Sequence, residues 1–176
     1  MVIEVRDYDE SWPLAADAAC RELRAAIPGV FDAIEHIGST AVPGLAAKPI
    51  IDLMAATGRL EAVREREADL ARLGYRHDDT GMPDRLFYRR SSSGVPTHHL
   101  HVVAADTWDS RNERLLRDHL RANPAYVARY AALKLRLATS SKDEDAYTRA
   151  KTNLIQELVD AARTARGLPL VPVWEE

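Results

Sequence analysis

Hydrophobic residues recur along the 176-residue chain at two different spacings, which predict two kinds of element. Short apolar runs bounded by Gly, Pro or Ser predict strands, and they fall in the front half of the chain. The predicted strands are 30–37, 50–55, 86–90 and 98–103. Apolar stripes with helical spacing predict a helix over 11–27, before the first of these strands, and another over 59–73, between the second and the third. The front half therefore alternates helices and strands.

The back half of the chain shows helical spacing throughout. Ser110 and Glu113 have the spacing of a capping box at a helix start, and a last helix is predicted over 142–166. We therefore expect the α+β class, with a mixed α/β core followed by helices. The predicted boundaries are 1–176 for a single domain, 1–106 for the α/β core and 107–176 for the C-terminal helices.

The segment 168–174 is apolar but is interrupted by two prolines. Such a segment packs either on the body of the protein or on a neighbouring subunit. The pattern leaves both alternatives open.

One charged residue interrupts the most apolar predicted strand. Asp52 lies inside the run Ile50-Ile51-Asp52-Leu53-Met54, where an ionised carboxylate is costly unless it has a partner, a metal or a shifted pKa. The turn Gly38-Ser39 precedes this strand and could offer backbone N–H groups and a hydroxyl to a phosphate. The alternative for such a turn is a purely structural role. Together the turn and the carboxylate predict a site rather than only a core.

Residues 36–52 read HIGSTAVPGLAAKPIID, which resembles the signature of the GrpB (UPF0157) family. That family in turn resembles the nucleotidyltransferase superfamily, whose signature is a Gly-Ser turn followed by a strand with acids at i and i+2. The resemblance implies a nucleotidyltransferase-like mixed β-sheet core with flanking helices and a C-terminal helical segment. It extends over almost the whole chain, through Tyr8, Trp12, the segment 99–102, Arg117-Asp118, Tyr130-x-x-Leu133-Lys134 and Tyr147-Thr148-x-x-Lys151.

The resemblance also implies roles for residues of this signature. In the superfamily the strand acids hold metal ions that neutralise charge on the transferred phosphate. Asp52 would then be the catalytic, metal-binding acid, but Met54 stands where the second acid is expected. Gly38, Ser39 and Lys48 would bind phosphate, although Lys48 could equally be an ordinary surface lysine.

Tyr147 and Lys151 share one face of the last predicted helix, at i and i+4. With Lys134 on the preceding helix, they could line a cleft opposite the strands and bind the ligand. The alternative is a tyrosine in a helix interface beside a solvated lysine.

His99 and His101 also lie at i and i+2, on one face of a predicted strand. If this strand neighbours that of Asp52, the three residues form a two-His, one-carboxylate set that suits Zn²⁺, Mn²⁺ or Fe²⁺ better than Mg²⁺. The cofactor prediction is therefore a divalent metal (Mg²⁺, Mn²⁺ or Zn²⁺) of open identity. In two alternatives the histidines hold Asp52 in a polar core cluster, or they contact an anion such as phosphate.

Composition narrows the classes of partner and location. The net charge is −3, which gives no strong signal for nucleic-acid binding. No apolar run approaches the roughly 18 residues that span a bilayer, so no membrane association is expected. Cys20 is the only cysteine, which excludes an intramolecular disulfide. The charged N-terminus does not resemble a signal peptide, and we expect a cytoplasmic protein.

Three hypotheses for function follow. The first is a nucleotidyltransferase-fold protein that binds a nucleotide or phosphorylated small molecule and could carry out metal-dependent transfer. The second is a non-catalytic accessory or folding-assistance domain with a protein partner, because GrpB-like sequences also occur fused to dephospho-CoA kinase domains. The third is a metal-dependent phosphohydrolase that uses the His-Asp set.

Overall fold

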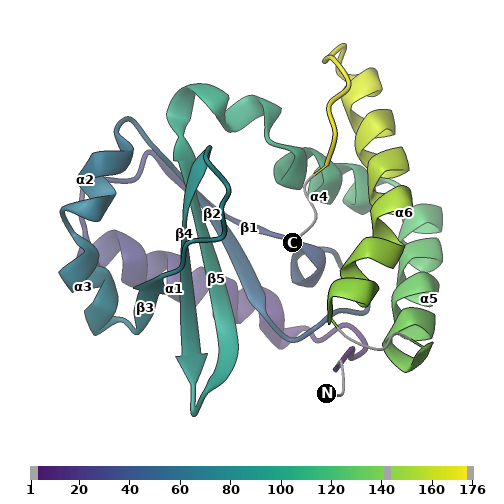
Figure 1. The fold of residues 1–176 in the computed structure, drawn as a ribbon, viewed down its shortest axis with the longest axis horizontal. Helices are drawn as coiled ribbons and strands as arrows, with labels where there is room; N and C mark the ends of the chain where they lie inside the picture. Colours follow the sequence, from purple (N-terminus) through teal and green to yellow (C-terminus); the bar gives the residue numbers. More distant parts are fainter. Residues whose placement is uncertain (1–3, 141–143, 174–176) are drawn as a thin grey trace.

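A five-stranded mixed sheet forms the centre of the computed structural model, which describes residues 4–140 and 144–173 (Figure 1). Helices pack on both sides of this sheet. In chain order the elements are α1 (Ser11–Ala26), β1 (Ala33–Ile37), the 3-10 helix η1 (Ser39–Ala41), β2 (Ile51–Thr57), α2 (Leu60–Arg64), α3 (Glu67–Arg72), β3 (Tyr75–His77), β4 (Arg85–Ser92), β5 (Val95–Ala104), the 3-10 helix η2 (Ala105–Ser110), α4 (Asn112–Ala122), α5 (Pro124–Ser140) and α6 (Glu144–Ala165). The predicted α+β class is confirmed.

The strand order is β1-β2-β5-β4-β3, and only the central pair β2 and β5 is parallel. In that pair Asp52 lies opposite His99, and Met54 lies opposite His101. Side chains alternate along a strand, so these four residues share one face of the sheet. Leu53 lies on the other face and is fully buried.

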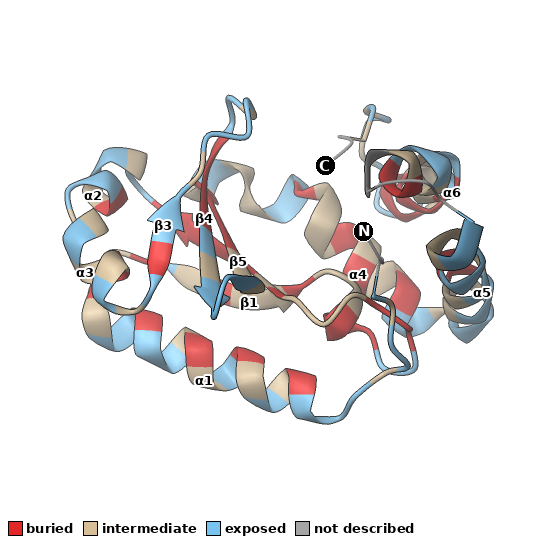
Figure 2. Ribbon diagram, turned by 60° about the horizontal axis from the view of Figure 1, so that its bottom comes forward, coloured by how far each residue is buried: buried red, intermediate tan, exposed pale blue. Residues whose placement is uncertain are grey.

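The face that carries Leu53 packs on α1, α2 and α3 to form the main core. The buried positions of α1 face the sheet, whereas its other positions are intermediate or exposed (Figure 2). Leu23 from α1 and Leu100 from β5 are both fully buried in this core, and each such side chain stabilises the fold by about 1.5–3 kcal/mol. This packing holds the opposite, polar face in position.

The C-terminal helices α4, α5 and α6 form a second cluster with the loop after η1. Leu45 from that loop packs with Leu120, Tyr130 and Leu158. The helices therefore stand beside the polar face of the sheet, and the Gly-Ser turn lies between the two halves (Figure 1).

Two local predictions are wrong. The helix predicted over 59–73 is broken into α2 and α3, because Arg66 leaves helical geometry and its guanidinium donates to the carbonyl of Ala26 at 3.2 Å. The capping box at Ser110 does not form: α4 begins at Asn112 without a side-chain cap, and Glu113 instead pairs with a distant arginine.

The tail after α6 packs on the body of the protein. The amide of Gln156 donates to the carbonyl of Val171, and its oxygen accepts from the N–H of Val173, each at 2.9 Å. Trp174 and the predicted start of the last helix at 142 lie outside the described residues. No helix in the described segments is both long and apolar enough to cross a membrane.

Candidate functional site

The Gly-Ser turn brings the backbone directly against the Asp52 carboxylate. Gly38 follows β1 with φ +74° and ψ −173°, a region that only glycine adopts readily. A Cβ atom at this position would lie 2.6 Å from Oδ2 of Asp52. Gly38 is therefore required by the turn and by this close approach.

Asp52 is held from the neighbouring strand by a histidine. Nδ1 of His99 lies 3.1 Å from Oδ1 of Asp52. Burial alone would raise the pKa of the Asp52 carboxyl, but the His99 hydrogen bond and the nearby rings of His101 and His36 outweigh it and hold the pKa below its usual range. Nε2 of His99 is buried and has no hydrogen-bond partner in the described residues. Asp52 is therefore ionised, and one ring nitrogen beside it is unsatisfied.

His101 has a different set of neighbours. Its Nδ1 lies 3.2 Å from Nη1 of Arg85, and its ring packs on Phe87 with centroids 4.8 Å apart. The same Arg85 nitrogen donates to Oε1 of Glu113 at 2.5 Å. Met54, beside His101 in the register, is fully buried among apolar side chains. The second acid position of the strand is therefore part of a small apolar cluster.

The predicted metal set does not form a ready three-ligand site. In the described part of the chain no group of three or more His, Cys, Asp or Glu side chains could hold a metal ion. The physical reason lies at His101, because the guanidinium of Arg85 beside its ring disfavours a second cation there. Asp52 alone suits Mg²⁺, which usually takes one or two carboxylates together with phosphate oxygens and water. Metal binding by this chain stays a prediction.

A buried lysine lies next to the Gly-Ser turn. The ammonium of Lys134, on α5, donates to the hydroxyl of Ser39 and lies 3.4 Å from the carbonyl of Ala46. The residue is 3% exposed and makes no ion pair with a carboxylate in the described residues. Burial, together with the nearby ammonium groups of Lys151 and Lys48, lowers the pKa of the Lys134 amine well below its usual range.

Two further lysines converge on the same region. Nζ of Lys48 lies 5.0 Å from the ring centroid of Tyr147, and Nζ of Lys151 lies 4.9 Å from it. A cavity of about 540 Å³ is lined by Lys48, Tyr147 and Lys151 together with Ser39 and other residues, and we call it the lysine cavity. The residues that line it include Ser39, Lys48, Asp52, His99, Lys134, Tyr147 and Lys151, and also Asp78, Asp79 and Arg89. Arg89 and Asp78 pair with each other.

The structure thus brings most of the predicted site residues to one place, with Gly38 at its edge against Asp52. His101 does not line the lysine cavity; it contacts Arg85 and lies close enough to Asp52 to help lower the pKa of that carboxyl. Lys134 was expected to line a cleft opposite the strands, but its burial and its contact with Ser39 were not predicted. Glu113 was missed as a site residue because its spacing matched a capping box.

Two solved structures share the fold of this chain. The chain matches the structure of the GLD-2/RNP-8 complex with a TM-score of 0.56 at 11% identity, covering 97% of this chain and 74% of that one. It matches terminal uridylyl transferase 4 from Trypanosoma brucei with bound dUTP with a TM-score of 0.51 at 14% identity, covering 97% and 64%. These likenesses concern the fold alone, and that fold is nucleotidyltransferase-like.

Nearer relatives identify the family. The family model described as GrpB protein matches residues 2–161, and the chain belongs to the GrpB family. Conserved protein GrpB from Enterococcus faecalis has a crystal structure that matches with a TM-score of 0.86 at 30% identity, covering 93% of this chain and 99% of that one. A UPF0157 protein of Pseudomonas aeruginosa is 36% identical over 179 residues, covering 96% of this chain and 71% of that protein. The predicted family is confirmed.

Some relatives are much longer than this chain. The UPF0157 protein YqkA of Bacillus subtilis is 31% identical over 163 residues, covering 92% of this chain and 47% of that protein, so the chain spans about half of its length. A dephospho-CoA kinase of Mycolicibacterium paratuberculosis is 30% identical over 169 residues, covering 81% of this chain and 42% of that protein.

Proposed function

We propose that this protein binds a nucleotide or another phosphorylated small molecule, with the phosphate in the lysine cavity. The observation that carries the proposal is Lys134, a buried lysine that has no carboxylate partner in the described residues and is aimed at the hydroxyl of Ser39. A buried ammonium without a counter-ion is costly, and proteins seldom retain one unless it meets an anion or reacts.

The surroundings of Lys134 favour a phosphate as that anion. Lys48 and Lys151 add two more positive charges from different elements, and Ser39 adds a hydroxyl beside the backbone of a glycine turn. Several donors around one cavity fit the several oxygens of a phosphate better than the two of a carboxylate. The unsatisfied Nε2 of His99 supplies one further polar atom at the same cavity.

The fold favours a nucleotide among phosphorylated ligands. The terminal uridylyl transferase 4 structure of the same fold carries dUTP. The cavity volume of about 540 Å³ lies in the range of ordinary small-molecule sites, about 300–1,000 Å³. Binding has more support than turnover, because Met54 replaces the second acid of the strand and leaves one carboxylate for a metal ion.

Isothermal titration calorimetry with pyrophosphate, ADP and ATP, with and without Mg²⁺ or Mn²⁺, tests the proposal. We expect saturable binding that falls at least about tenfold in Lys134→Met, as for loss of one charge-assisted hydrogen bond. Arg136→Met is the matched control, because Arg136 lies on the same helix but is exposed and lines neither cavity. Unchanged binding in Lys134→Met, or equal losses in both variants, would contradict the proposal.

A second candidate function is an accessory role toward dephospho-CoA kinase. It rests on the 30% identity to a segment of the Mycolicibacterium paratuberculosis kinase. A direct test is the refolding yield and thermal stability of that kinase's remaining region, with and without this chain added in equimolar amount. An increase that also occurs with Lys134→Met would favour the accessory role over ligand binding.

A further inference from the structure

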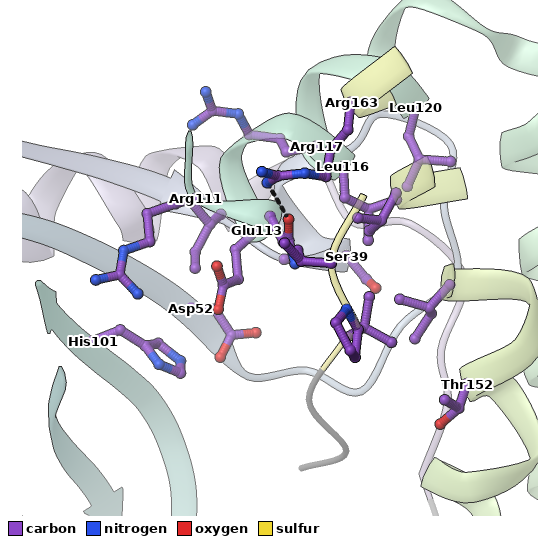
Figure 3. Close-up of a pocket in the computed structure, with 18 of the residues that line it drawn as sticks. Ser39, Asp52, His101, Arg111, Glu113, Leu116, Arg117, Leu120, Thr152 and Arg163 are labelled. Atoms are coloured by element: carbon purple, nitrogen blue, oxygen red, sulfur yellow. Dashed lines mark hydrogen bonds between the residues drawn. The ribbon is translucent and has the colours of Figure 1, made fainter. Parts of the chain in front are cut away.

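A second cavity of about 570 Å³ meets the lysine cavity at Asp52. The residues that contact both cavities are Ser39, Asp52, Thr148 and Lys151. The second cavity extends from there between α4, α6 and the tail (Figure 3). It is therefore a second chamber at the same carboxylate rather than an isolated void.

One wall of this chamber is apolar. Side chains from three separate segments form it: Leu116 and Leu120 of α4, Ile155 and Val159 of α6, and Val171 and Val173 of the tail. Gln156 pins the tail in this position by bonding the carbonyl of Val171 and the N–H of Val173. We call the second cavity, with this apolar wall, the apolar chamber.

The arginines of the apolar chamber are already engaged. Arg85 pairs with Glu113, and Arg111 pairs with Asp84. Arg117 pairs with a carboxylate outside the chamber, and Arg163 donates to the carbonyl of Ser110 at 2.9 Å. Arg163 also bonds the tail through the carbonyl of Pro169, and so it anchors the wall. This chamber therefore offers no cluster of lysines like that of its neighbour and is poorly suited to a second phosphate.

The polar end of the chamber presents hydrogen-bond acceptors. Figure 3 shows Asp52, Glu113 and His101 gathered at this end, whereas Leu120 and Thr152 lie toward the other. Burial would raise the pKa of the Glu113 carboxyl, but the charge of Arg85 outweighs it and keeps the group ionised. Asp52 and Glu113 accept hydrogen bonds, and Asp84 adds a third carboxylate to the lining, so a group that donates hydrogen bonds finds acceptors at this end.

We propose that the apolar chamber binds a second ligand, an alcohol or amine with an apolar body, whose hydroxyl or amino group lies at Asp52 beside the phosphorylated ligand. The role of this second ligand as a reaction partner of the phosphorylated ligand rests on the proposed function. Its binding in the apolar chamber does not depend on the proposed function. Two ligands that meet at one carboxylate have the proximity that transfer between them requires.

Three probes with the same six-carbon body separate the chemical classes: n-hexylamine, 1-hexanol and hexanoate. Dissociation constants come from chemical-shift titrations of the ¹⁵N-labelled full chain. We expect the amine and the alcohol to bind saturably, with hexanoate at least about tenfold weaker because a carboxylate offers no hydrogen-bond donor to these acceptors. Equal affinities for all three, or no saturable binding of amine and alcohol, would overturn the proposal.

Variants locate the binding. Ile155→Ser removes apolar surface from the wall and should weaken hexylamine binding about tenfold. Leu135→Ser, at a position 42% exposed on α5, is the matched control and should leave it unchanged. If Ile155→Ser does not fold, Val171→Trp fills the chamber from the tail and should abolish hexylamine binding. Full binding by Val171→Trp or by folded Ile155→Ser would place the probe elsewhere and overturn the proposal.

Crossed measurements separate this inference from the proposed function. Ile155→Ser should bind pyrophosphate normally, whereas Lys134→Met should lose pyrophosphate binding and keep hexylamine binding, because Lys134 lines only the lysine cavity. If the unmodified chain binds hexylamine but not pyrophosphate, only the proposed function is overturned. If the unmodified chain binds pyrophosphate but not hexylamine, only the proposal that the apolar chamber is a ligand site is overturned.

Discussion

Replacing Gly38 with alanine tests the geometry on which the site depends. Gly38 has φ +74° and ψ −173°, and forcing an alanine into this region costs about 1–3 kcal/mol. The new Cβ would lie 2.6 Å from Oδ2 of Asp52. The carboxylate would have to move and give up its His99 hydrogen bond, which adds about 1–3 kcal/mol. We expect Gly38→Ala to lower the free energy of unfolding by about 2–6 kcal/mol.

Gly29 supplies the control for backbone strain. It has φ +75°, and a Cβ there would meet nothing within 4 Å. Gly29→Ala should therefore cost only about 1–2 kcal/mol, the strain of a positive φ. Equilibrium urea unfolding followed by far-UV circular dichroism measures both variants under one set of conditions.

A double-mutant cycle isolates the contact with Asp52. In the Asp52→Ala background Oδ2 is absent, so Gly38→Ala should cost about 1–2 kcal/mol less than in the original chain. Equal costs for Gly38→Ala and Gly29→Ala would refute the close approach of turn and carboxylate. Strict additivity in the cycle would refute it as well.

Two further predictions concern buried charges. Because burial lowers the Lys134 pKa, the unfolded chain binds one more proton than the native protein between the lowered pKa and that of a free lysine. The free energy of unfolding should then rise by up to about 1.4 kcal/mol per pH unit between about pH 8 and 10, and less steeply in Lys134→Met. Urea unfolding across that range checks this, and identical slopes would contradict it. Glu113→Gln should cost about 1–3 kcal/mol, since Arg85, whose side chain is 4% exposed, loses its 2.5 Å partner and keeps the Asp84 carboxylate at 3.1 Å. The double variant Arg85→Met/Glu113→Leu should recover most of that loss in the same assay. A cost under about 1 kcal/mol for Glu113→Gln would show that the Arg85–Glu113 ion pair is no stronger than a surface ion pair.

The alternation of side chains between the two faces of the sheet could be predicted well from the sequence. The placement of His99 and His101 on one face, opposite Leu100, follows from residue spacing alone because successive strand side chains point to opposite sides. The run 36–52 was long enough to indicate the family, and through it the fold. Both features are local in the chain, so sequence carries them.

Contacts between distant segments were beyond prediction. Lys134 and Ser39 are 95 residues apart, and the motif around Lys134 suggested a place in a cleft without indicating that the ammonium would be buried against Ser39. Glu113 has the local spacing of a helix cap, yet its partner is Arg85, 28 residues away. An ion pair with a buried guanidinium outweighs a cap worth about 1 kcal/mol.

The family, the α+β class and the strand that carries Asp52 could all be predicted from the sequence, because these depend on residue type and spacing within short segments. Only the packing of distant elements shows that Lys134 is buried beside the Gly-Ser turn and that His101 contacts Arg85. It also divided the space around Asp52 into two chambers of different chemistry. The reason is that burial and pairing depend on which elements the fold brings together, and a side chain's charge and contacts follow from those neighbours.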